Sequence, residues 1–275
     1  MTTTQQDSVH TFRALHTPAR PLALANAWDV ASALIVESAG APAIATTSAG
    51  VAWSLGCPDG DALTRDEAVA AISRITAAVT VPVTADIETG YGDGPDDVAE
   101  TVRQVVAAGA AGVNIEDGTR PPADLAARLA AARDAVGADL FLNARIDTYL
   151  FGLGEDGTRL KETLERAHRY VEAGADGIFV PGVTDLDTVA ELAAEIPVPL
   201  NVMAGPGAPS VAEFGAVGVA RVSLGSGVAQ AAYTAARRTA QELLGTGGYA
   251  PLADAVDFGE LNGLLSAPAA RHSSE

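Results

Sequence analysis

The sequence contains little of the sulfur and nitrogen chemistry that many enzymes use. Its 275 residues include one cysteine, Cys57, one lysine, Lys161, and four histidines. A single cysteine excludes an intramolecular disulfide framework and a cysteine-based structural zinc site. No histidine lies near Cys57 in the sequence to generate a thiolate, and Lys161 has the charged neighbours of a solvent-facing helix. Neither thiol nor Schiff-base catalysis is therefore expected.

Positive charge and long apolar runs are also scarce. Seventeen Lys and Arg residues face 35 Asp and Glu residues, which gives a formal net charge of −18. Without a positive field to attract phosphates, neither nucleic acid nor an anionic membrane is expected as a partner. No uncharged apolar run reaches the length of a membrane span, and residues 1–20 lack the apolar region of a signal peptide. We expect a cytoplasmic protein.

The chain does contain a regular alternation of short apolar or β-branched runs with longer segments of helical period. Repeated βα units without an internal linker are typical of an α/β protein and predict a (β/α)8 TIM barrel over residues 1–245. Residues 246–275 form a predicted C-terminal helical appendage that either packs on a neighbouring subunit or frays. The eight strands are expected at Leu22–Trp28, Ala43–Ser48, Val81–Glu88, Gly112–Asp117, Leu140–Asp147, Gly177–Pro181, Val198–Ala204 and Arg221–Leu224.

Polar residues collect at the carboxyl ends of these predicted strands, where a TIM barrel places its chemistry. The ends carry a dense set of carboxylates together with one arginine. Carboxylates that face one mouth repel one another, so such a cluster is expected to be neutralised by protons, by an arginine or by a metal. The polar residues at these ends are Asn26, Asp29, Thr47, Ser48, Asp86, Glu88, Glu116, Asp117, Asn143, Arg145, Asp147, Asn201 and Ser223.

The end of the third predicted strand is the most informative of them. Alternation along a strand puts Asp86 and Glu88 on the same side, and the following Gly90 and Gly92 let the chain turn away tightly. Two carboxylates supply the hard oxygen ligands that Mg²⁺ or Mn²⁺ prefers. A solvated pair of carboxylates, or a salt bridge to Arg145, are alternatives that this motif leaves open.

Arg145 and the segment 46–51 supply candidate contacts for an acidic substrate. The planar guanidinium of Arg145 suits a carboxylate, although the neighbouring acidic residues could equally be its partners. Residues 46–51 end the second predicted strand in small side chains, which leaves backbone N–H groups free to bind a carboxylate. Asp59, in the long loop that follows, either adds a carboxylate or serves only the Pro-Asp-Gly turn.

Six short motifs occur in a fixed order along the chain. They are Asn26-Ala27-Trp28-Asp29 with Ser32-Ala33, Ser48-Ala49-Gly50, Pro58-Asp59, Asp86-x-Glu88-x-Gly90-Tyr91-Gly92, Asn114-x-Glu116-Asp117 and Ala144-Arg145. This set, from about Ala23 to Leu224, resembles the isocitrate lyase/phosphoenolpyruvate mutase superfamily. The resemblance implies a Mg²⁺-dependent barrel, with Mn²⁺ as an alternative metal. Such a barrel would act on small 2-oxo acids or their 2-hydroxy relatives and would break or form a C–C or P–C bond next to a carboxylate.

The same resemblance implies a role for each matching residue. Asp86 would ligate the metal directly, while Glu88, Glu116 and Asp59 would hold metal-bound waters. Arg145, Glu116 and Asp59 are the implied catalytic residues. The implied substrate-binding residues are Trp28, Thr47, Ser48, Ala49, Gly50, Asp86, Arg145 and Asn201.

Two departures from the superfamily pattern affect the expected reaction. Isocitrate-type lyases carry K-x-C-G-H after the fourth strand, and the mutase and phosphonopyruvate hydrolase branches carry a longer loop with Lys and Asn. This chain has Gly118–Ala123 there and runs into a helix. The glutamate of the methylisocitrate branch after strand six is Gly182 in this chain.

The metal-binding carboxylates, Arg145 and the backbone cradle at residues 48–50 remain. Together they predict a Mg²⁺-dependent lyase or decarboxylase that acts through an enolate on a small 2-oxo (or 2-hydroxy) dicarboxylic acid, such as an oxaloacetate-like compound. One alternative is P–C chemistry of the phosphonopyruvate hydrolase or phosphoenolpyruvate mutase type. The other is a barrel that binds a small anionic 2-oxo acid without lyase activity. Superfamily members are commonly tetramers that exchange a C-terminal helix, so a homo-oligomer, tetramer or dimer, is expected.

Overall fold

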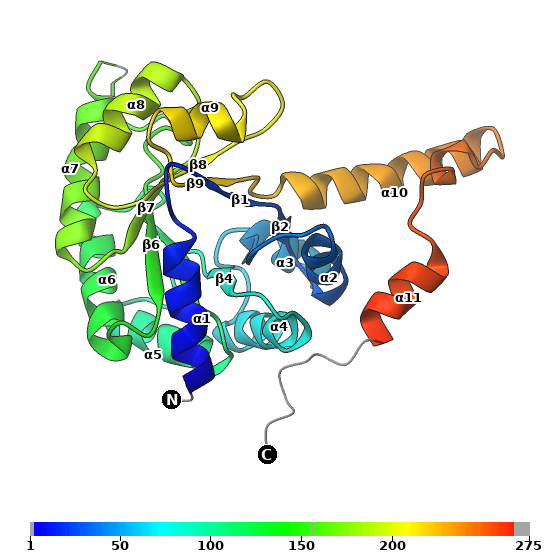
Figure 1. The fold of residues 1–275 in the computed structure, drawn as a ribbon, viewed down its shortest axis with the longest axis horizontal. Coiled ribbons are helices and arrows are strands. Elements are labelled where there is room, and N and C mark those ends of the chain that lie inside the picture. The colour runs from blue at the N-terminus through cyan, green and yellow to red at the C-terminus, as the bar shows by residue number, and fades with distance from the viewer. Residues whose placement is uncertain (1–2, 156, 267–275) are drawn as a thin grey trace.

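The strands of the computed structural model, which describes residues 3–155 and 157–266, are all parallel and form one sheet. The first predicted strand is split into β1 (Leu22–Leu24) and β2 (Asn26–Ala27). Since β1 pairs with β9 (Arg221–Ser223) and β2 pairs with β3 (Ile44–Thr46), the sheet closes on itself. The prediction of a (β/α)8 barrel is confirmed (Figure 1). The other strands are β4 (Val83–Asp86), β5 (Gly112–Glu116), β6 (Phe141–Arg145), β7 (Gly177–Val180) and β8 (Leu200–Met203).

The helices that follow the strands form the outer layer of the barrel. At the start of α4 (Arg65–Ala78), Thr64 and Glu67 form a capping box. A short helix, α3 (Ser48–Ser54), begins within residues 46–51, which are predicted as the end of the second strand. The remaining helices around the barrel are α2 (Val30–Ser38), α5 (Pro95–Ala107), α6 (Pro122–Val136), α7 (Arg159–Glu172), α8 (Leu186–Glu195) and α9 (Val211–Ala216).

A helix that the sequence analysis does not predict, α1 (Thr3–Ala14), closes the N-terminal end of the barrel. Phe12 is fully buried and packs edge-on against Phe141, the first residue of β6, with ring centroids 5.5 Å apart. Arg13 donates to the carbonyl oxygen of Leu140 at 3.2 Å and to Asp176. The end of the barrel opposite the acidic mouth is therefore plugged by protein.

The last part of the chain leaves the barrel. Helix α10 (Gly227–Gly245) projects away from it, and the chain returns through the 3-10 helix η1 (Ala250–Leu252) to α11 (Phe258–Ser266), which lies beside α2 (Figure 1). Within α10 only Ala229 is buried among the described residues. Because α10 points outward, an open apolar groove of about 520 Å³ remains between α2 and α9, lined mainly by Leu24, Ile35, Val36, Val211, Val222 and Leu224. The division at residue 245 stays a prediction.

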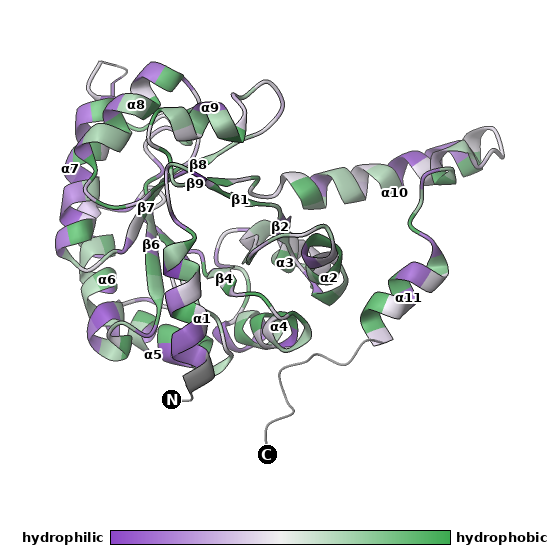
Figure 2. Ribbon diagram, viewed as in Figure 1, coloured by the Kyte–Doolittle hydropathy of each residue, from purple (hydrophilic) through white to green (hydrophobic). Residues whose placement is uncertain are grey.

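Hydropathy follows this architecture. The barrel strands and the inner faces of the helices are apolar, while the outward face of α7 is strongly hydrophilic (Figure 2). On α7, Lys161 is exposed and pairs with Glu165 at 3.7 Å, as its sequence neighbours indicate. None of the helices in the described ranges is long and apolar enough to cross a membrane.

Candidate active site

A cavity of about 190 Å³ opens at the carboxyl ends of the strands. It brings together residues that lie far apart in the sequence: Asp59 from the loop after α3, Asp86 from β4 and Arg145 from β6. Apolar side chains cover part of its wall. The lining residues are Asn26, Thr47, Ser48, Ala49, Asp59, Asp86, Asn114, Arg145, Leu150, Phe179, Met203, Ser223, Gly225 and Ser226.

Asp86 ends β4 and lines the cavity, whereas Glu88, two residues further on, has different surroundings. The Glu88 main-chain N–H donates to Asp86 Oδ1 at 3.1 Å, and Glu88 adopts a left-handed backbone with φ 52°. Glu88 is buried, and its Oε2 accepts from the main-chain N–H groups of Gly60, at 3.0 Å, and Asp61. Glu88 therefore holds the loop that carries Asp59, while its Oε1 is buried without a partner in the described part of the chain.

Arg145 is held between two carboxylates. Its Nη1 lies 2.5 Å from Glu116 Oε2 and its Nε donates to Asp147 Oδ1 at 2.7 Å. The guanidinium also lies 5.9 Å from the ring centre of Phe179. The two carboxylates fix the plane of the guanidinium, and Arg145 still lines the cavity. The pairing that the sequence analysis names as an alternative is thus present, together with access to a ligand.

The electrostatics of this cluster favour a bound cation. Burial raises the pKa of Asp86 and of Glu116, and it raises the pKa of Glu88 to about 7. The nearby Asp59 raises all three further, whereas Arg145 lowers the pKa of Asp86 and Glu116. Arg145 and the more deeply buried Arg221, which also interacts with Asp86, do not compensate this many carboxylates, so a divalent cation or protons are needed to complete the charge balance.

The donor set fits Mg²⁺ that keeps most of its waters. Among the described residues, no three His, Cys, Asp or Glu side chains converge closely enough to enclose a metal ion. Mg²⁺ is usually held by one or two carboxylates plus waters rather than by a full protein cage. Asp86 and Asp59 both face the cavity, which meets that requirement, and Glu116 stands beside Asp86 in the electrostatic cluster.

The predicted substrate cradle lies at the N-terminus of α3. Thr47 precedes the helix without a side-chain capping bond, and Thr47, Ser48 and Ala49 line the cavity. The first N–H groups of a helix have no intrahelical acceptor, so they are free for a ligand. At Gly50 an added Cβ would lie 2.8 Å from Trp28 Cβ, so Trp28 packs against the helix and supports the cradle from behind. Its contact with substrate stays a prediction.

Three polar residues at the predicted strand ends have structural partners. Asp29 caps α2 by accepting from the N–H of Ser32 at 2.7 Å. Asp117 is fully buried and accepts from Arg166 and from the Tyr170 hydroxyl, both at 2.8 Å, so it ties β5 to α7. Asn201 is 1% exposed and lies below the lining residues, and its substrate contact stays a prediction.

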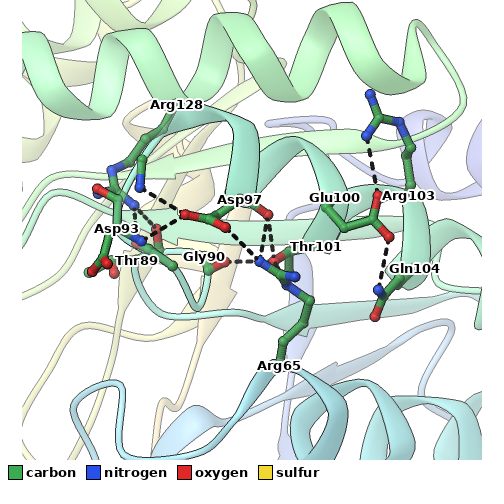
Figure 3. A network of polar contacts seen from close by, with 12 residues as sticks. Arg65, Thr89, Gly90, Asp93, Asp97, Glu100, Thr101, Arg103, Gln104 and Arg128 are labelled. Atoms are coloured by element: carbon green, nitrogen blue, oxygen red, sulfur yellow. Dashed lines mark hydrogen bonds and ion pairs between the residues drawn. The ribbon is translucent and has the colours of Figure 1, made fainter.

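Sequence reasoning missed the residue that fixes the glycine-rich loop after β4. Arg128 of α6 is only 2% exposed, and its guanidinium donates to the carbonyl oxygens of Thr89, Gly92 and Asp93 at 3.1, 2.9 and 2.9 Å (Figure 3). On the other side of this loop, the Thr101 hydroxyl donates to the Gly90 carbonyl at 2.7 Å and itself accepts from Arg65 at 2.8 Å. These contacts anchor the loop that follows Asp86 and Glu88.

The structure supports both departures from the superfamily pattern. Residues 117–121 connect β5 directly to α6, and this connection contains no Cys, Lys or His. At Gly182, φ is 89° and an added Cβ would lie 2.6 Å from the main-chain nitrogen of Leu150. This position has no room for the glutamate of the methylisocitrate branch.

We expect Gly182→Ala to lower the free energy of unfolding by about 1–3 kcal/mol, because it combines backbone strain with a main-chain clash. Gly205→Ala is the matched control, since nothing lies within 4 Å of its added Cβ. Urea denaturation of both variants measures the difference. Equal unfolding free energies for G182A and wild type would contradict the steric argument.

A parallel barrel with an acidic cavity at the carboxyl ends of its strands defines the class: an α/β-barrel protein whose candidate site lies where such barrels carry their catalytic residues. The model of the phosphoenolpyruvate phosphomutase family matches residues 12–244. The chain belongs to this family, within the isocitrate lyase/phosphoenolpyruvate mutase superfamily of lyases and mutases. The resemblance identified from the motifs is confirmed.

Individual relatives agree with this membership. An uncharacterized protein of Mycobacterium tuberculosis is 44% identical over 219 residues, which cover 78% of this chain and 81% of that protein. The 2-methylisocitrate lyase of Escherichia coli is 34% identical over 220 residues, covering 74% and 70% of the two chains. The structure of a phosphonopyruvate hydrolase with oxalate and Mg²⁺ has a TM-score of 0.80 at 26% identity and covers 93% of this chain and 95% of its own.

Proposed function

We propose that this protein is a Mg²⁺-dependent carbon–carbon lyase or decarboxylase that acts on a small 2-oxo dicarboxylic acid, such as an oxaloacetate-like compound. The observation that carries the proposal is the cavity of about 190 Å³, which places Arg145 and the acidic residues Asp59 and Asp86 around one small space. Such a cavity matches the size of a short dicarboxylate better than that of a larger ligand, and Arg145 together with a bound Mg²⁺ would balance the substrate's charge.

The residues of the cavity have distinct proposed tasks. Arg145, with its plane fixed by Glu116 and Asp147, binds a substrate carboxylate. The free N–H groups of Ser48 and Ala49 hold the other carboxylate or the 2-oxo oxygen. Asp86 ligates the metal, with Asp59, Glu88 and Glu116 around it. When bound, Mg²⁺ supplies a Lewis acid next to the 2-oxo group.

For an oxaloacetate-like substrate the proposed reaction is bond cleavage to an enolate. The C–C bond to the distal carboxylate breaks, CO₂ leaves, and the electron pair passes into the enolate of the remaining 2-oxo acid. A solvent proton then adds to the carbon that lost CO₂. This sequence needs no thiol or amine, which agrees with residues 117–121, where the superfamily's Cys-containing loop is absent.

Chelation tests the proposal directly. Dialysis against EDTA is expected to abolish turnover of oxaloacetate, measured as pyruvate and CO₂, and added Mg²⁺ is expected to restore it. Turnover that is indifferent to the metal would contradict the proposal. Consumption of phosphonopyruvate, followed by phosphorus NMR, would instead favour P–C chemistry. Tight binding of a 2-oxo acid without product would favour a binding protein.

We also propose that the protein is a homo-oligomer held together by its C-terminal segment. Apolar residues recur along α10, η1 and α11 (Figure 2), and several of them are exposed. An apolar groove also lies open between α2 and α9. Large exposed apolar surfaces of this kind mark protein interfaces. The large apolar residues exposed in this segment are Tyr233, Leu243, Leu244, Tyr249, Leu252, Val256, Phe258 and Leu265.

Substitution of two of these residues is expected to change the assembly. Leu244 and Phe258 are 85% and 81% exposed, so L244D/F258D is expected to leave the fold intact while it lowers the molar mass in light scattering after size exclusion. Leu55→Asp, at an exposed apolar residue outside this segment, is the control and is expected to keep the wild-type mass. A monomeric wild-type protein would contradict the proposed assembly.

A further inference from the structure

Three asparagines and one arginine form a connected row of hydrogen bonds across the barrel interior, from the cavity wall at Asn114 to the layer below it. Asn114, Asn143, Asn201 and Arg221 come from β5, β6, β8 and β9, and their exposed fractions are 5%, 2%, 1% and 1%. We call these four residues the asparagine row. Buried carboxamides are costly unless they are hydrogen-bonded, so the orientation of each one has a physical cause.

The orientation of the row is set at Asn201. Its Nδ2 donates to the main-chain carbonyl oxygens of Val202 and Arg221 at 2.8 and 3.2 Å. A carbonyl oxygen only accepts hydrogen bonds, so the Asn201 carboxamide cannot be turned over. Its Oδ1 therefore faces Asn143, whose Nδ2 donates to it at 3.2 Å.

The hydrogen bonds of Asn143 and Asn114 extend this fixed orientation to Asp86. Asn143 Nδ2 also donates to Asn114 Oδ1 at 2.9 Å, and Arg221 Nη2 approaches the same oxygen at 3.4 Å. With two donors on its oxygen, Asn114 must direct its own Nδ2 the other way. That nitrogen lies 3.5 Å from Asp86 Oδ2. The orientation fixed by main-chain carbonyls on β8 and β9 is thus passed to the carboxylate at the end of β4.

We propose that Asn114 is a positioning residue for the metal ligand Asp86, and that Asn143 acts on the metal site only by fixing the orientation of Asn114. The Asn114 amide holds Oδ2 while the Glu88 main-chain N–H holds Oδ1, so the carboxylate plane is fixed from two sides. This inference rests on the proposed function, because it assumes that Asp86 binds a divalent cation. Partners of metal ligands commonly change metal affinity by about 10- to 100-fold when they are replaced.

Mn²⁺ titration, followed by electron paramagnetic resonance, tests the proposal without reference to turnover. Asn143→Asp places an acceptor against Asn114 Oδ1, which turns the Asn114 carboxamide over and points its oxygen at Asp86. N143D and N114A are each expected to weaken Mn²⁺ binding by about 10- to 100-fold. The double variant N114A/N143D is expected to bind no more weakly than N114A, because Asn143 acts through Asn114.

The control lies on the same strand as Asp86. Thr84 is buried, and its hydroxyl has no hydrogen-bond partner in the part of the chain that the structure describes, so T84V is expected to keep the wild-type affinity. If N143D does not fold, N143A replaces it, because it removes the donor without adding a charge. N143A is expected to weaken Mn²⁺ binding relative to wild type, whereas N114A/N143A is expected to bind Mn²⁺ as N114A does.

Each outcome has a separate meaning. Wild-type affinity in a folded N143D, or in N143A where N143D does not fold, overturns the inference while the proposed function stands. If the losses of Mn²⁺ affinity in N114A and N143D add up in the double variant, the inference is also overturned, because Asn143 then affects the metal site without acting through Asn114. A wild-type protein that binds no Mn²⁺ overturns the proposed metal chemistry and the positioning role together.

Discussion

Asp86→Asn is expected to lower Mn²⁺ affinity by more than about 100-fold and to reduce turnover of oxaloacetate to the background rate. The loss of a direct ligand should exceed the 10- to 100-fold effects that follow replacement of a ligand's partner. The fold should tolerate the change. Burial and the neighbouring Asp59 raise the pKa of Asp86, so a neutral group of the same shape removes the cost of a buried charge, and this gain offsets the one hydrogen bond that the amide nitrogen cannot accept.

Two measurements separate a lost metal site from a damaged fold. D86N is expected to melt at the wild-type temperature or above it, while isothermal titration shows the loss of Mg²⁺ binding. Asp185→Asn is the matched control, because Asp185 caps α8 at the surface and Asn caps helices equally well. Unchanged metal affinity in a folded D86N would refute the assignment of Asp86 as the direct ligand.

Arg145→Met is expected to have the second largest effect, on both activity and stability. It removes the cation that contacts Glu116 and Asp147, and breaking a buried ion pair by removing one partner typically costs about 3–5 kcal/mol. The substrate carboxylate would lose its anchor as well. Oxaloacetate turnover is expected to fall to background, and the urea midpoint is expected to fall clearly.

Arg145→Lys separates these two roles of Arg145. A lysine keeps the positive charge among the carboxylates, but it cannot present the planar fork that contacts Glu116 and Asp147 together. We expect a stability close to wild type and a KM for oxaloacetate raised by about 10- to 100-fold, from the loss of a charge-assisted hydrogen bond to the substrate carboxylate worth about 1.5–3 kcal/mol. R145K with wild-type KM would show that Arg145 serves the carboxylates alone.

The barrel and the core of the site follow from local patterns in the sequence. Each predicted strand has a counterpart in the structure, because apolar runs of β period separated by helical segments leave few other ways to bury both faces of a sheet. The carboxyl ends of parallel strands share one edge, so the convergence of Asp59, Asp86 and Arg145 in one cavity could be anticipated without coordinates.

The side on which a strand-end residue points is harder to predict. Asp117 directly follows Glu116, so the alternation along an extended chain turns it away from the mouth, and it finds Arg166 and Tyr170 on α7. A position at a strand end therefore does not show which way a side chain points, because the direction depends on whether the residue is odd or even along the strand. Asn201 is the second residue of β8, which places it one layer below the cavity.

The importance of Arg128 could have been predicted from its position, because it is a charged residue within an apolar helical stripe. It shares a helical face with Leu125, Leu129, Ala132 and Val136, all of which are buried. A charged residue in the middle of an apolar stripe must find buried partners, and in this fold they are the carbonyl oxygens of the loop after β4. The sequence does not reveal which carbonyls they are, because that depends on how α6 packs against its neighbours.

The direct connection between β5 and α6 has a kinetic consequence. Where the superfamily pattern has a Cys-containing loop or a longer loop with Lys and Asn, residues 117–121 turn straight into a helix that begins with Pro122. At this position substrate entry requires no closing motion and product release waits for no opening. The rate-limiting step is then expected to be a chemical one, so kcat should be independent of solvent viscosity and sensitive to heavy-atom substitution at the bond that breaks.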